Sequence, residues 1–158
     1  MIRPWFQPQE RQDALESAAR AWEGTPYFAN AASRGHGVGC VNLVHELFFE
    51  AGAITKRIEL PIYQTDYAHH STQTQLLRFL MDHPDLTGRL LFVPVQGRRL
   101  PGDLFGVRSG HVDHHLACAV KWGKVAQAIE DHGVVIVDET EKTFASRILY
   151  VLRLMEVA

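Results

Sequence analysis

The stretch Gly37-Val38-Gly39-Cys40-Val41-Asn42-Leu43-Val44 decides how this chain folds, because it joins a loop to a helix. Residues 31–39 contain three glycines and show no apolar periodicity. From Cys40 onward, apolar residues recur every three or four positions as far as Gly52, a residue type that often ends helices. The pattern predicts a helix over Cys40–Ala51 and places Cys40 in its first turn.

The first turn of a helix is a place where a thiol can become a nucleophile. The N–H groups there have no partner within the helix, and the helix dipole adds about half a positive charge. This environment stabilises a thiolate, lowers the pKa of the thiol and can bind a developing oxyanion. Cys40 is therefore a candidate nucleophile; the alternative is a small apolar residue in the core, where free cysteines often lie.

Two more helices and a run of strands are predicted around this segment. A helix is expected over Gln9–Trp22, which follows Pro8 and has one apolar face, and another over Thr72–Met81, where leucines form a stripe. Strands are expected at residues 90–95, 103–107, 115–121, 125–130, 133–138 and 147–154. Helices followed by short strands with Gly-containing turns predict an α+β fold with an antiparallel sheet.

Length and charge exclude several classes of protein. The 158 residues fit a single domain over residues 1–158, which can bury a core without disulfides. A formal net charge of −2 argues against a nucleic-acid partner. The sequence contains no apolar run of about 18 residues, the length that would predict a membrane span. It also shows no secretory signal, so a cytoplasmic location is the default expectation. We expect no cofactor, and the oligomeric state is not predicted.

His115 and Gln127 are the best candidates to work with the thiol. His115 opens a strand of otherwise apolar or small residues, a position that suits a side chain facing a cleft. If the strands at 115–121 and 125–130 form a hairpin about Trp122-Gly123, Gln127 lies near His115 on the same face. The Gln127 carbonyl can then fix the imidazole tautomer and leave the other ring nitrogen for the thiol.

The second cysteine, Cys118, is expected to be a core residue. It lies three positions after His115, and the two-residue period of a strand turns it to the opposite face. It should be neither a second nucleophile nor a disulfide partner of Cys40.

Five motifs occur in an order that is informative about the family. They are Gly24-Thr25-Pro26-Tyr27, the stretch Gly37–Val44, Pro101-Gly102-Asp103-Leu104, His115-Leu116-Ala117-Cys118-Ala119-Val120, and Gln127 followed by Gly133-Val134. Their order and spacing resemble the NlpC family of papain-like bacterial cell-wall cysteine peptidases. The match extends from about residue 15 to 154, and its specificity lies in the order of motifs that are individually weak.

The resemblance implies a papain-like fold and a role for each matching residue. Cys40 is then the nucleophile, His115 the general base and acid, and Gln127 the orienting third member. Tyr27 matches a tyrosine near the nucleophile that helps to bind the oxyanion. The expected oxyanion and substrate contacts are Tyr27, Gly39, Val41 and His114. The segment from Glu59-Leu60-Pro61-Ile62-Tyr63 to His69-His70-Ser71 is expected to be an insertion over the cleft, and the expected partner is a peptide or small amide substrate.

The chain departs from the family at the residues around the nucleophile. The family usually has Asp before the cysteine and Ser-Gly after it, and these residues help to hold the free amino end of a peptide stem. Here Gly39 precedes Cys40, and Val41 and Asn42 follow it. The departure removes support for the usual γ-D-glutamyl–diamino acid specificity and leaves Cys40, His115 and Gln127 unchanged.

Three other functions fit the same residues. An acyltransferase would use the same thiol and histidine with a different acceptor. A zinc site would need about three ligands, for which His111, His114 and His115 with His69 or His70 are candidates, although adjacent histidines on a strand point to opposite faces. The altered neighbours of Cys40 also fit a catalytically silent binding domain.

Overall fold

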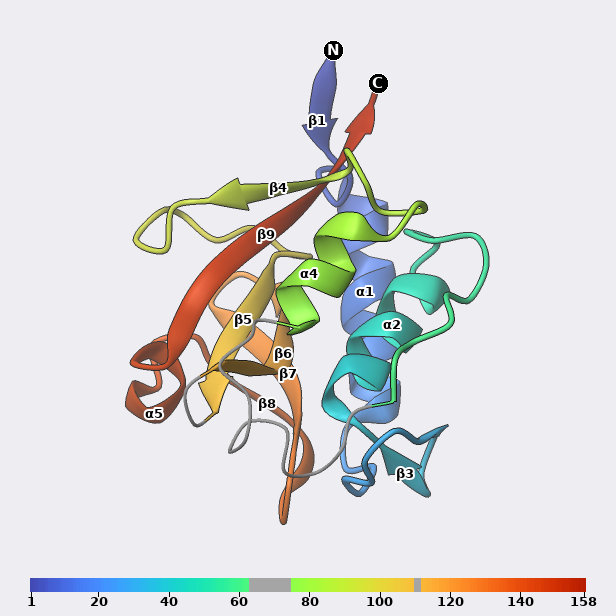
Figure 1. Cartoon of the computed structure of the whole chain (residues 1–158), viewed down its shortest axis with the longest axis vertical. Coiled ribbons are helices and arrows are strands. Elements are labelled where there is room, and N and C mark those ends of the chain that lie inside the picture. The colour runs from blue at the N-terminus through green and yellow to red at the C-terminus, as the bar shows by residue number, and fades with distance from the viewer. Residues whose placement is uncertain (63–74, 110–111) are drawn as a thin grey trace.

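The computed structural model describes residues 1–62, 75–109 and 112–158. Its helices are α1 (Gln9–Trp22), α2 (Cys40–Glu50), α4 (Gln75–Asp82) and α5 (Lys142–Ala145). Its strands are β1 (Ile2–Pro4), β2 (Ala32–Ser33), β3 (Gly37–Val38), β4 (Leu90–Val93), β5 (Leu104–Ser109), β6 (Val112–Lys121), β7 (Lys124–Ile129), β8 (Gly133–Asp138) and β9 (Ile148–Val157). Figure 1 shows a curled sheet with α1 and α2 on one side and α5 on the other.

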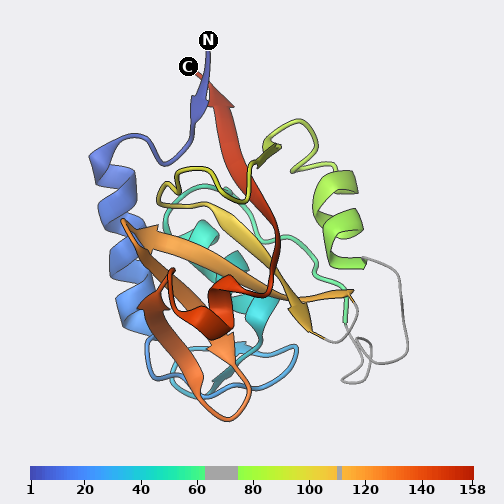
Figure 2. The ribbon, with the colours of Figure 1, turned by 90° about the vertical axis from the view of Figure 1, so that its left-hand side faces the viewer.

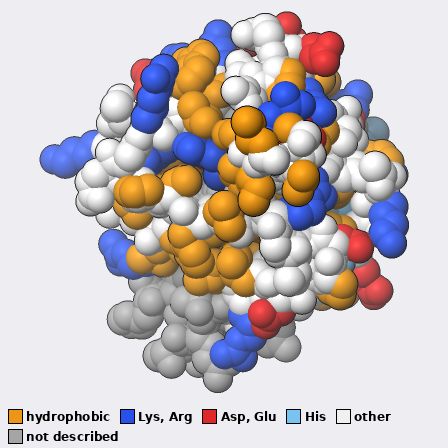
Figure 3. Space-filling model, turned by 90° about the horizontal axis from the view of Figure 1, so that it is seen from above, with side chains coloured by type: hydrophobic (Ala, Val, Ile, Leu, Met, Phe, Trp, Pro, Cys, Tyr) orange, Lys and Arg blue, Asp and Glu red, His pale blue; other side chains and the backbone are white. Residues whose placement is uncertain are grey.

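The main sheet has the strand order β1-β9-β5-β6-β7-β8, and β4 pairs with β9. The named strand pairs are antiparallel. Because Ile2 pairs with Val157, the two termini lie side by side at one end of the molecule (Figure 1). Viewed from that end, hydrophobic side chains gather between basic ones (Figure 3). Helix α2 begins at the opposite end, directly after β3 (Figure 1).

One face of the sheet is covered by α1 and α2. Leu15 of α1 and Leu43 and Leu47 of α2 are fully buried, in the same cluster as Leu116 and Cys118 of β6. Full burial of a leucine side chain stabilises the fold by about 1.5–3 kcal/mol relative to exposure, so this packing fixes α2 against the sheet. The N-terminus of α2 is thereby held beside β6.

The other face of the sheet has a smaller core under α5, which faces the viewer in Figure 2. Phe144 of α5 packs edge to face on Phe105 of β5, with ring centroids 5.2 Å apart. Ala117 and Val125 belong to the same cluster. Alternation along β6 therefore puts His115 and Ala117 on this face, while Leu116 and Cys118 face the helices.

A β-bulge interrupts the pairing of β5 with β6 between Val107 and Arg108. The pairing passes from Val107↔His115 to Arg108↔Asp113, which leaves His114 as an extra residue on β6. A bulge bends the strand and changes the direction of the side chains near it. His114 and His115 therefore occupy an irregular part of β6 rather than the regular ladder.

Most of the predicted elements are confirmed. The predicted helix Gln9–Trp22 matches α1, and the turns at Trp122-Gly123 and Asp131–Gly133 join β6 to β7 and β7 to β8. The α+β prediction is confirmed as well. Residues 72–74 of the predicted third helix lie outside the described residues, and the helix that follows them is α4.

The strands β1, β2 and β3 and helix α5 were not predicted. The expected loop at 31–39 contains a small hairpin, in which Ala32 pairs with Val38 and Ser33 with Gly37. These elements have two to four residues each, too few to show a periodic pattern. Within the described residues, none of the helices has the length and apolar character that crossing a membrane requires.

Candidate active site

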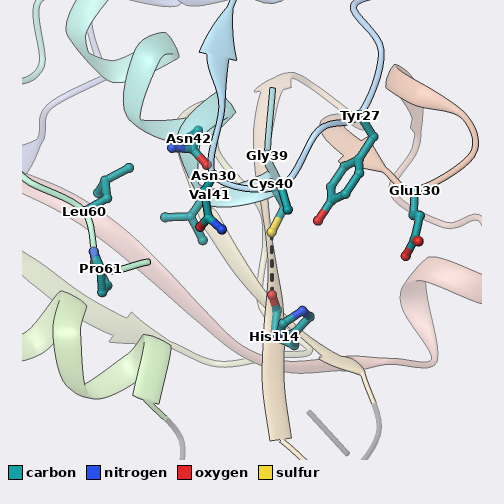
Figure 4. Close-up of a pocket in the computed structure, with 11 residues that line it drawn as sticks. Tyr27, Asn30, Gly39, Cys40, Val41, Asn42, Leu60, Pro61, His114 and Glu130 are labelled. Atoms are coloured by element: carbon teal, nitrogen blue, oxygen red, sulfur yellow. Dashed lines mark hydrogen bonds between the residues drawn. The ribbon is translucent and has the colours of Figure 1, made fainter. Parts of the chain in front are cut away.

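The thiol of Cys40 lies between the first turn of α2 and the backbone of β6. It donates to the His114 carbonyl oxygen, with 3.5 Å between sulfur and oxygen (Figure 4). The sulfur also accepts from backbone N–H groups of Leu116, of Val41 and of Cys40 itself. The sulfur is therefore held by donors from both the helix terminus and the strand.

Burial raises the pKa of the Cys40 thiol, while the hydrogen bonds from Leu116, Val41 and Cys40 lower it by a smaller amount. The sequence-based expectation of a lowered pKa is therefore wrong. The helix terminus does stabilise the thiolate, but the loss of hydration beneath β6 outweighs that effect. The resting form of this cysteine is the neutral thiol.

His115 and Gln127 form a hydrogen-bonded pair. The His115 Nε2 and the Gln127 Oε1 are 2.8 Å apart. Because a carbonyl oxygen only accepts, Nε2 must donate, and the lone pair of a neutral imidazole then resides on Nδ1. Burial lowers the pKa of His115, and the bond to Gln127 raises it by a smaller amount. His115 is therefore neutral at neutral pH and able to accept a proton.

The hairpin between β6 and β7 brings these two side chains together. Cys118 pairs with Ala126, so the next residue, Gln127, shares the face of the sheet that carries His115. Gln127 is 5% exposed, and its hydrogen bond to His115 satisfies an amide oxygen that would be costly to bury alone. The shared face and the pairing expected from the turn at Trp122-Gly123 are confirmed.

Tyr27 reaches the site because its segment pairs with the residues before Cys40. The N–H of Phe28 donates to the Val38 carbonyl at 3.1 Å, and the N–H of Val38 donates to Pro26 at 3.0 Å. The Tyr27 side chain lies beside Cys40 (Figure 4). Burial raises the pKa of Tyr27 to about 12, with smaller contributions from the negative charges of Cys40 and Glu130. Its hydroxyl therefore remains protonated and able to donate.

A side chain at position 39 would meet the Asn42 amide and the Asn30 backbone. A Cβ on Gly39 would lie 2.5 Å from Asn42 Oδ1 and 3.0 Å from the Asn30 backbone nitrogen. The first distance is shorter than side chains tolerate, so the Asn42 amide occupies the space that a side chain at position 39 would need. Asn42, which the sequence shows only as a departure from the family, therefore shapes the site directly.

The wall opposite Tyr27 is formed by Leu60 and Pro61 (Figure 4). The segment that carries them is tied to α2 because His45 Nε2 accepts the Ile58 N–H at 2.8 Å. Burial lowers the pKa of His45, which keeps this ring neutral and able to accept. The nucleophile and this wall are thus attached to the same helix.

Two pockets meet at Cys40. The amide pocket, of about 140 Å³, is lined by Asn30, Gly39, Val41, Asn42, Leu60 and Pro61. The arginine pocket, of about 270 Å³, is lined by Val107, Arg108, His115, Gln127, Phe144 and Arg147 among others. Tyr27, Cys40, His114 and Glu130 line both. Together the pockets form one cleft with Cys40 at its centre.

All seven predicted site residues lie in this cleft. The predicted catalytic residues Cys40, His115 and Gln127 line the arginine pocket. The predicted contact residues Tyr27, Gly39, Val41 and His114 line the amide pocket together with Cys40.

Sequence reasoning missed several residues of the cleft, among them Asn30, Arg108, Glu130 and Arg147. The sequence could have indicated Glu130, since Glu130 follows Gln127 by three positions and directly follows the end of β7. Arg147 and Arg108 are brought together by pairing between β5 and the start of β9, which leaves no local pattern. We expected adjacent histidines on a strand to point to opposite faces. The bulge in β6 instead lets His114 and His115 line the same pocket.

The remaining predicted residues fall largely outside the described part of the chain. His69, His70, Ser71 and His111 lie there, as does most of the expected insertion. Among residues 1–62, 75–109 and 112–158, no three His, Cys, Asp or Glu side chains are grouped so that they could hold a metal ion.

Comparison with known proteins identifies the fold. No family model matches the sequence. A search of curated proteins also finds no match. A lipoprotein-like protein of the NLP/P60 family from Staphylococcus aureus has a similar structure, with a TM-score of 0.64 and 18% identity over 98% of this chain and 44% of its own. The NlpC/p60 domain of the peptidoglycan hydrolase SagA matches with a TM-score of 0.55 and 17% identity, over 89% of this chain and 97% of that domain.

The structure is thus a papain-like α+β fold of the NlpC/P60 type, as the sequence resemblance implied. The chain spans less than half of the length of the staphylococcal protein. Identities of 17–18% establish the fold alone.

Proposed function

We propose that this protein is a cysteine hydrolase that cleaves an amide bond with Cys40, His115 and Gln127. The 2.8 Å hydrogen bond between His115 and Gln127, in the pocket that also contains the Cys40 thiol, is the observation that carries the proposal. A thiol, a neutral imidazole and a group that fixes the imidazole tautomer are the parts that nucleophilic acyl transfer requires.

The first half of the reaction forms a thioester. The Cys40 sulfur attacks the carbonyl carbon of the amide while its proton passes to Nδ1 of His115. Because the thiol and the imidazole are both neutral at rest, this proton transfer accompanies the attack. The N–H groups at the start of α2 and the Tyr27 hydroxyl stabilise the oxyanion. His115 then protonates the leaving nitrogen, and the C–N bond breaks.

The second half of the reaction releases the acid. A water molecule attacks the thioester carbonyl while His115 accepts its proton, and the Cys40 thiol leaves with that proton. Gln127 holds the Nε2–H throughout and keeps Nδ1 directed toward the reacting atoms. The chemistry requires no cofactor.

The proposed substrate is a peptidoglycan stem peptide or a related small amide. Support comes from the fold shared with SagA, which is a peptidoglycan hydrolase. The amide pocket argues against the usual way of holding a free amino end, because Asn42 fills the place of a side chain at position 39. An acyltransferase would pass the same thioester to an amine in place of water.

A catalytically silent binding domain is the second candidate. The raised pKa of Cys40 is the observation that favours it, because a neutral thiol reacts slowly unless a base takes its proton.

Alkylation by iodoacetamide at pH 7 separates these candidates. Cys118 is an internal control, since it is fully buried and burial raises its pKa. A hydrolase should be alkylated at Cys40 much faster than at Cys118, and His115→Ala should slow the alkylation of Cys40. Equal and slow alkylation of both cysteines would favour the binding domain.

Digestion of purified muropeptides, analysed by mass spectrometry, tests the substrate. Wild-type protein should release a fragment that Cys40→Ala does not release. Fast alkylation of Cys40 without any muropeptide cleavage would keep the hydrolase and exclude this substrate.

A further inference from the structure

The direction in which a substrate lies in the cleft follows from the position of the general acid. His115 must protonate the leaving nitrogen, so the amine half of the amide has to lie on the His115 side of Cys40. His115 lines the arginine pocket and is absent from the lining of the amide pocket. The amine half therefore occupies the arginine pocket, and the acyl half occupies the amide pocket.

The two pockets offer different chemistry to these halves. Neutral groups dominate the amide pocket, where Asn30, Asn42, Leu60 and Pro61 lie to one side of Cys40. The arginine pocket instead has Arg108 and Arg147 in its lining, both on its exposed rim. The arginine pocket is thus the one that offers cationic side chains to its half of the substrate.

The two arginines are adjacent because of the backbone around them. The N–H of Arg108 donates to the carbonyl of Arg147 at 2.8 Å. This contact lies beside the bulges of the sheet, where pairing shifts on both sides of Val107. Bulges next to active sites commonly direct side chains toward them. Arginine suits carboxylates, because its planar fork donates two parallel hydrogen bonds.

Two carboxylates, Glu130 and Glu141, also line the arginine pocket. Glu141 uses both carboxylate oxygens to cap α5, accepting from the N–H groups of Thr143 at 3.0 Å and Phe144 at 2.9 Å. These hydrogen bonds lower the pKa of the Glu141 carboxylate, and the charge of Arg147 contributes to the lowering. Glu130 lines both pockets and lies on the Tyr27 side of the cleft, where its charge contributes to the raised pKa of Tyr27 (Figure 4). A negative group on the amine half would therefore be attracted to the arginines and repelled from the Tyr27 side.

We propose that Arg108 and Arg147 bind a carboxylate carried by the amine half of the substrate. The substrate class is then an amide in which an acyl group without net charge is joined to an amino acid or peptide with a free carboxylate close to the scissile nitrogen. This inference rests on the proposed function, because it uses His115 as the general acid. Arg108 and Arg147 are specificity-determining residues in this scheme, outside the catalytic steps.

A pair of alkylating reagents tests the inference without knowledge of the natural substrate. N-(iodoacetyl)glycine carries a carboxylate on the amine side of its amide, and N-(iodoacetyl)glycinamide is its neutral counterpart. The rate of Cys40 alkylation by each is measured by mass spectrometry on the full-length protein at low salt. We expect the acid to react about fivefold faster than the amide, the size of one exposed ion pair.

Variants assign this preference to the arginines. The double substitution Arg108→Met with Arg147→Met should bring the ratio of the two rates to about one, chiefly by slowing the reaction with the acid reagent. Arg20→Met, which removes the same charge from the exposed face of α1, is the matched control and should keep the ratio. Added salt should lower the wild-type ratio and leave the double variant unaffected.

The outcomes separate this inference from the proposed function. Fast alkylation of Cys40 with equal rates for the two reagents, or a preference that survives the double substitution, would overturn the role of the arginines and keep the hydrolase. If both reagents alkylate Cys40 as slowly as Cys118, the proposed function fails, and the inference fails with it.

Discussion

The two halves of β6 differ in what their backbone does. From Leu116 to Val120 the strand is buried, and Cys118 pairs with Leu104 on one side and Ala126 on the other. Before Leu116 the strand contains the bulge at His114, whose carbonyl oxygen accepts from the Cys40 thiol. One half of the strand belongs to the core, and the other belongs to the candidate active site.

The comparison shows how a single strand supports both stability and chemistry. A regular ladder satisfies each backbone group with a neighbouring strand and leaves little for a ligand or a nucleophile. An irregular stretch leaves a backbone group available, here the His114 carbonyl oxygen, which accepts from the Cys40 thiol. Substitutions in the site half should therefore reduce activity with little loss of stability, and substitutions in the core half should do the reverse.

The largest effect is expected from His115→Ala in the site half. Loss of the general base and acid should lower the rate of amide cleavage by about a thousandfold, while the melting temperature should fall by only a few degrees, the cost of leaving the Gln127 amide without its partner. Muropeptide digestion and thermal unfolding measure the two quantities. His132→Ala, in the exposed turn before β8, is the matched control and should be fully active. A large drop in melting temperature for His115→Ala would show that the site half of β6 supports stability as much as the core half does.

The stability of the core half of β6 should respond most strongly to Asp103→Ala, because Asp103 lies just before β5 and is bonded to Ala119 of β6. Asp103 is fully buried, its backbone carbonyl accepts the Ala119 N–H at 2.8 Å, and its carboxylate forms two 2.8 Å bonds with Arg153. Removing one member of a buried ion pair should lower the free energy of unfolding by about 3–5 kcal/mol.

Urea unfolding measures this loss, and the exposed pair between Lys124 and Asp138 supplies its control. Asp138→Ala should cost less than about 1 kcal/mol. Equal costs for Asp103→Ala and Asp138→Ala would show that the β6 core half does not depend on its buried ion pair.

A smaller effect is expected where the site half meets α2. Gly39→Asp should lower the free energy of unfolding by about 1–3 kcal/mol, because its Cβ collides with the Asn42 amide. The double variant Gly39→Asp with Asn42→Gly should be less affected than the two single changes added together. Unfolding of the four proteins forms a double-mutant cycle, and strict additivity would show that Asn42 does not occupy this space.

The smallest effect on activity is expected from substitutions of Gln127. The pH profile of kcat/KM is the measurement that shows it best. Activity requires neutral His115, so kcat/KM should rise as pH increases through a His115 pKa that burial holds below the ordinary value. Gln127→Glu places a carboxylate beside the ring, so the acid limb should move up by about one pH unit.

Gln127→Leu provides the opposite change. It removes the hydrogen bond that raises the pKa of His115, so the acid limb should move down. The maximal rate should also fall about tenfold, because the imidazole loses its fixed tautomer. An acid limb that stays in place in both variants would separate Gln127 from the titration of His115.

Local patterns were sufficient for much of the fold and for the central residues. The apolar period after Cys40 predicted α2 and put the thiol at its start. The turn at Trp122-Gly123 predicted a hairpin that brings His115 and Gln127 to one face. Such features depend on backbone preferences and side-chain alternation over a few residues, which a single sequence displays directly.

The sequence by itself determined the order of the elements, the position of Cys40 at the start of α2 and the hairpin that brings His115 and Gln127 to one face. Only the tertiary structure decided the protonation of the thiol, because its pKa depends on how deeply β6 buries it. Long-range pairing also decided the bulge at His114 and the meeting of Arg108 with Arg147. Desolvation and strand register arise between segments far apart in the chain, so no local pattern contains them.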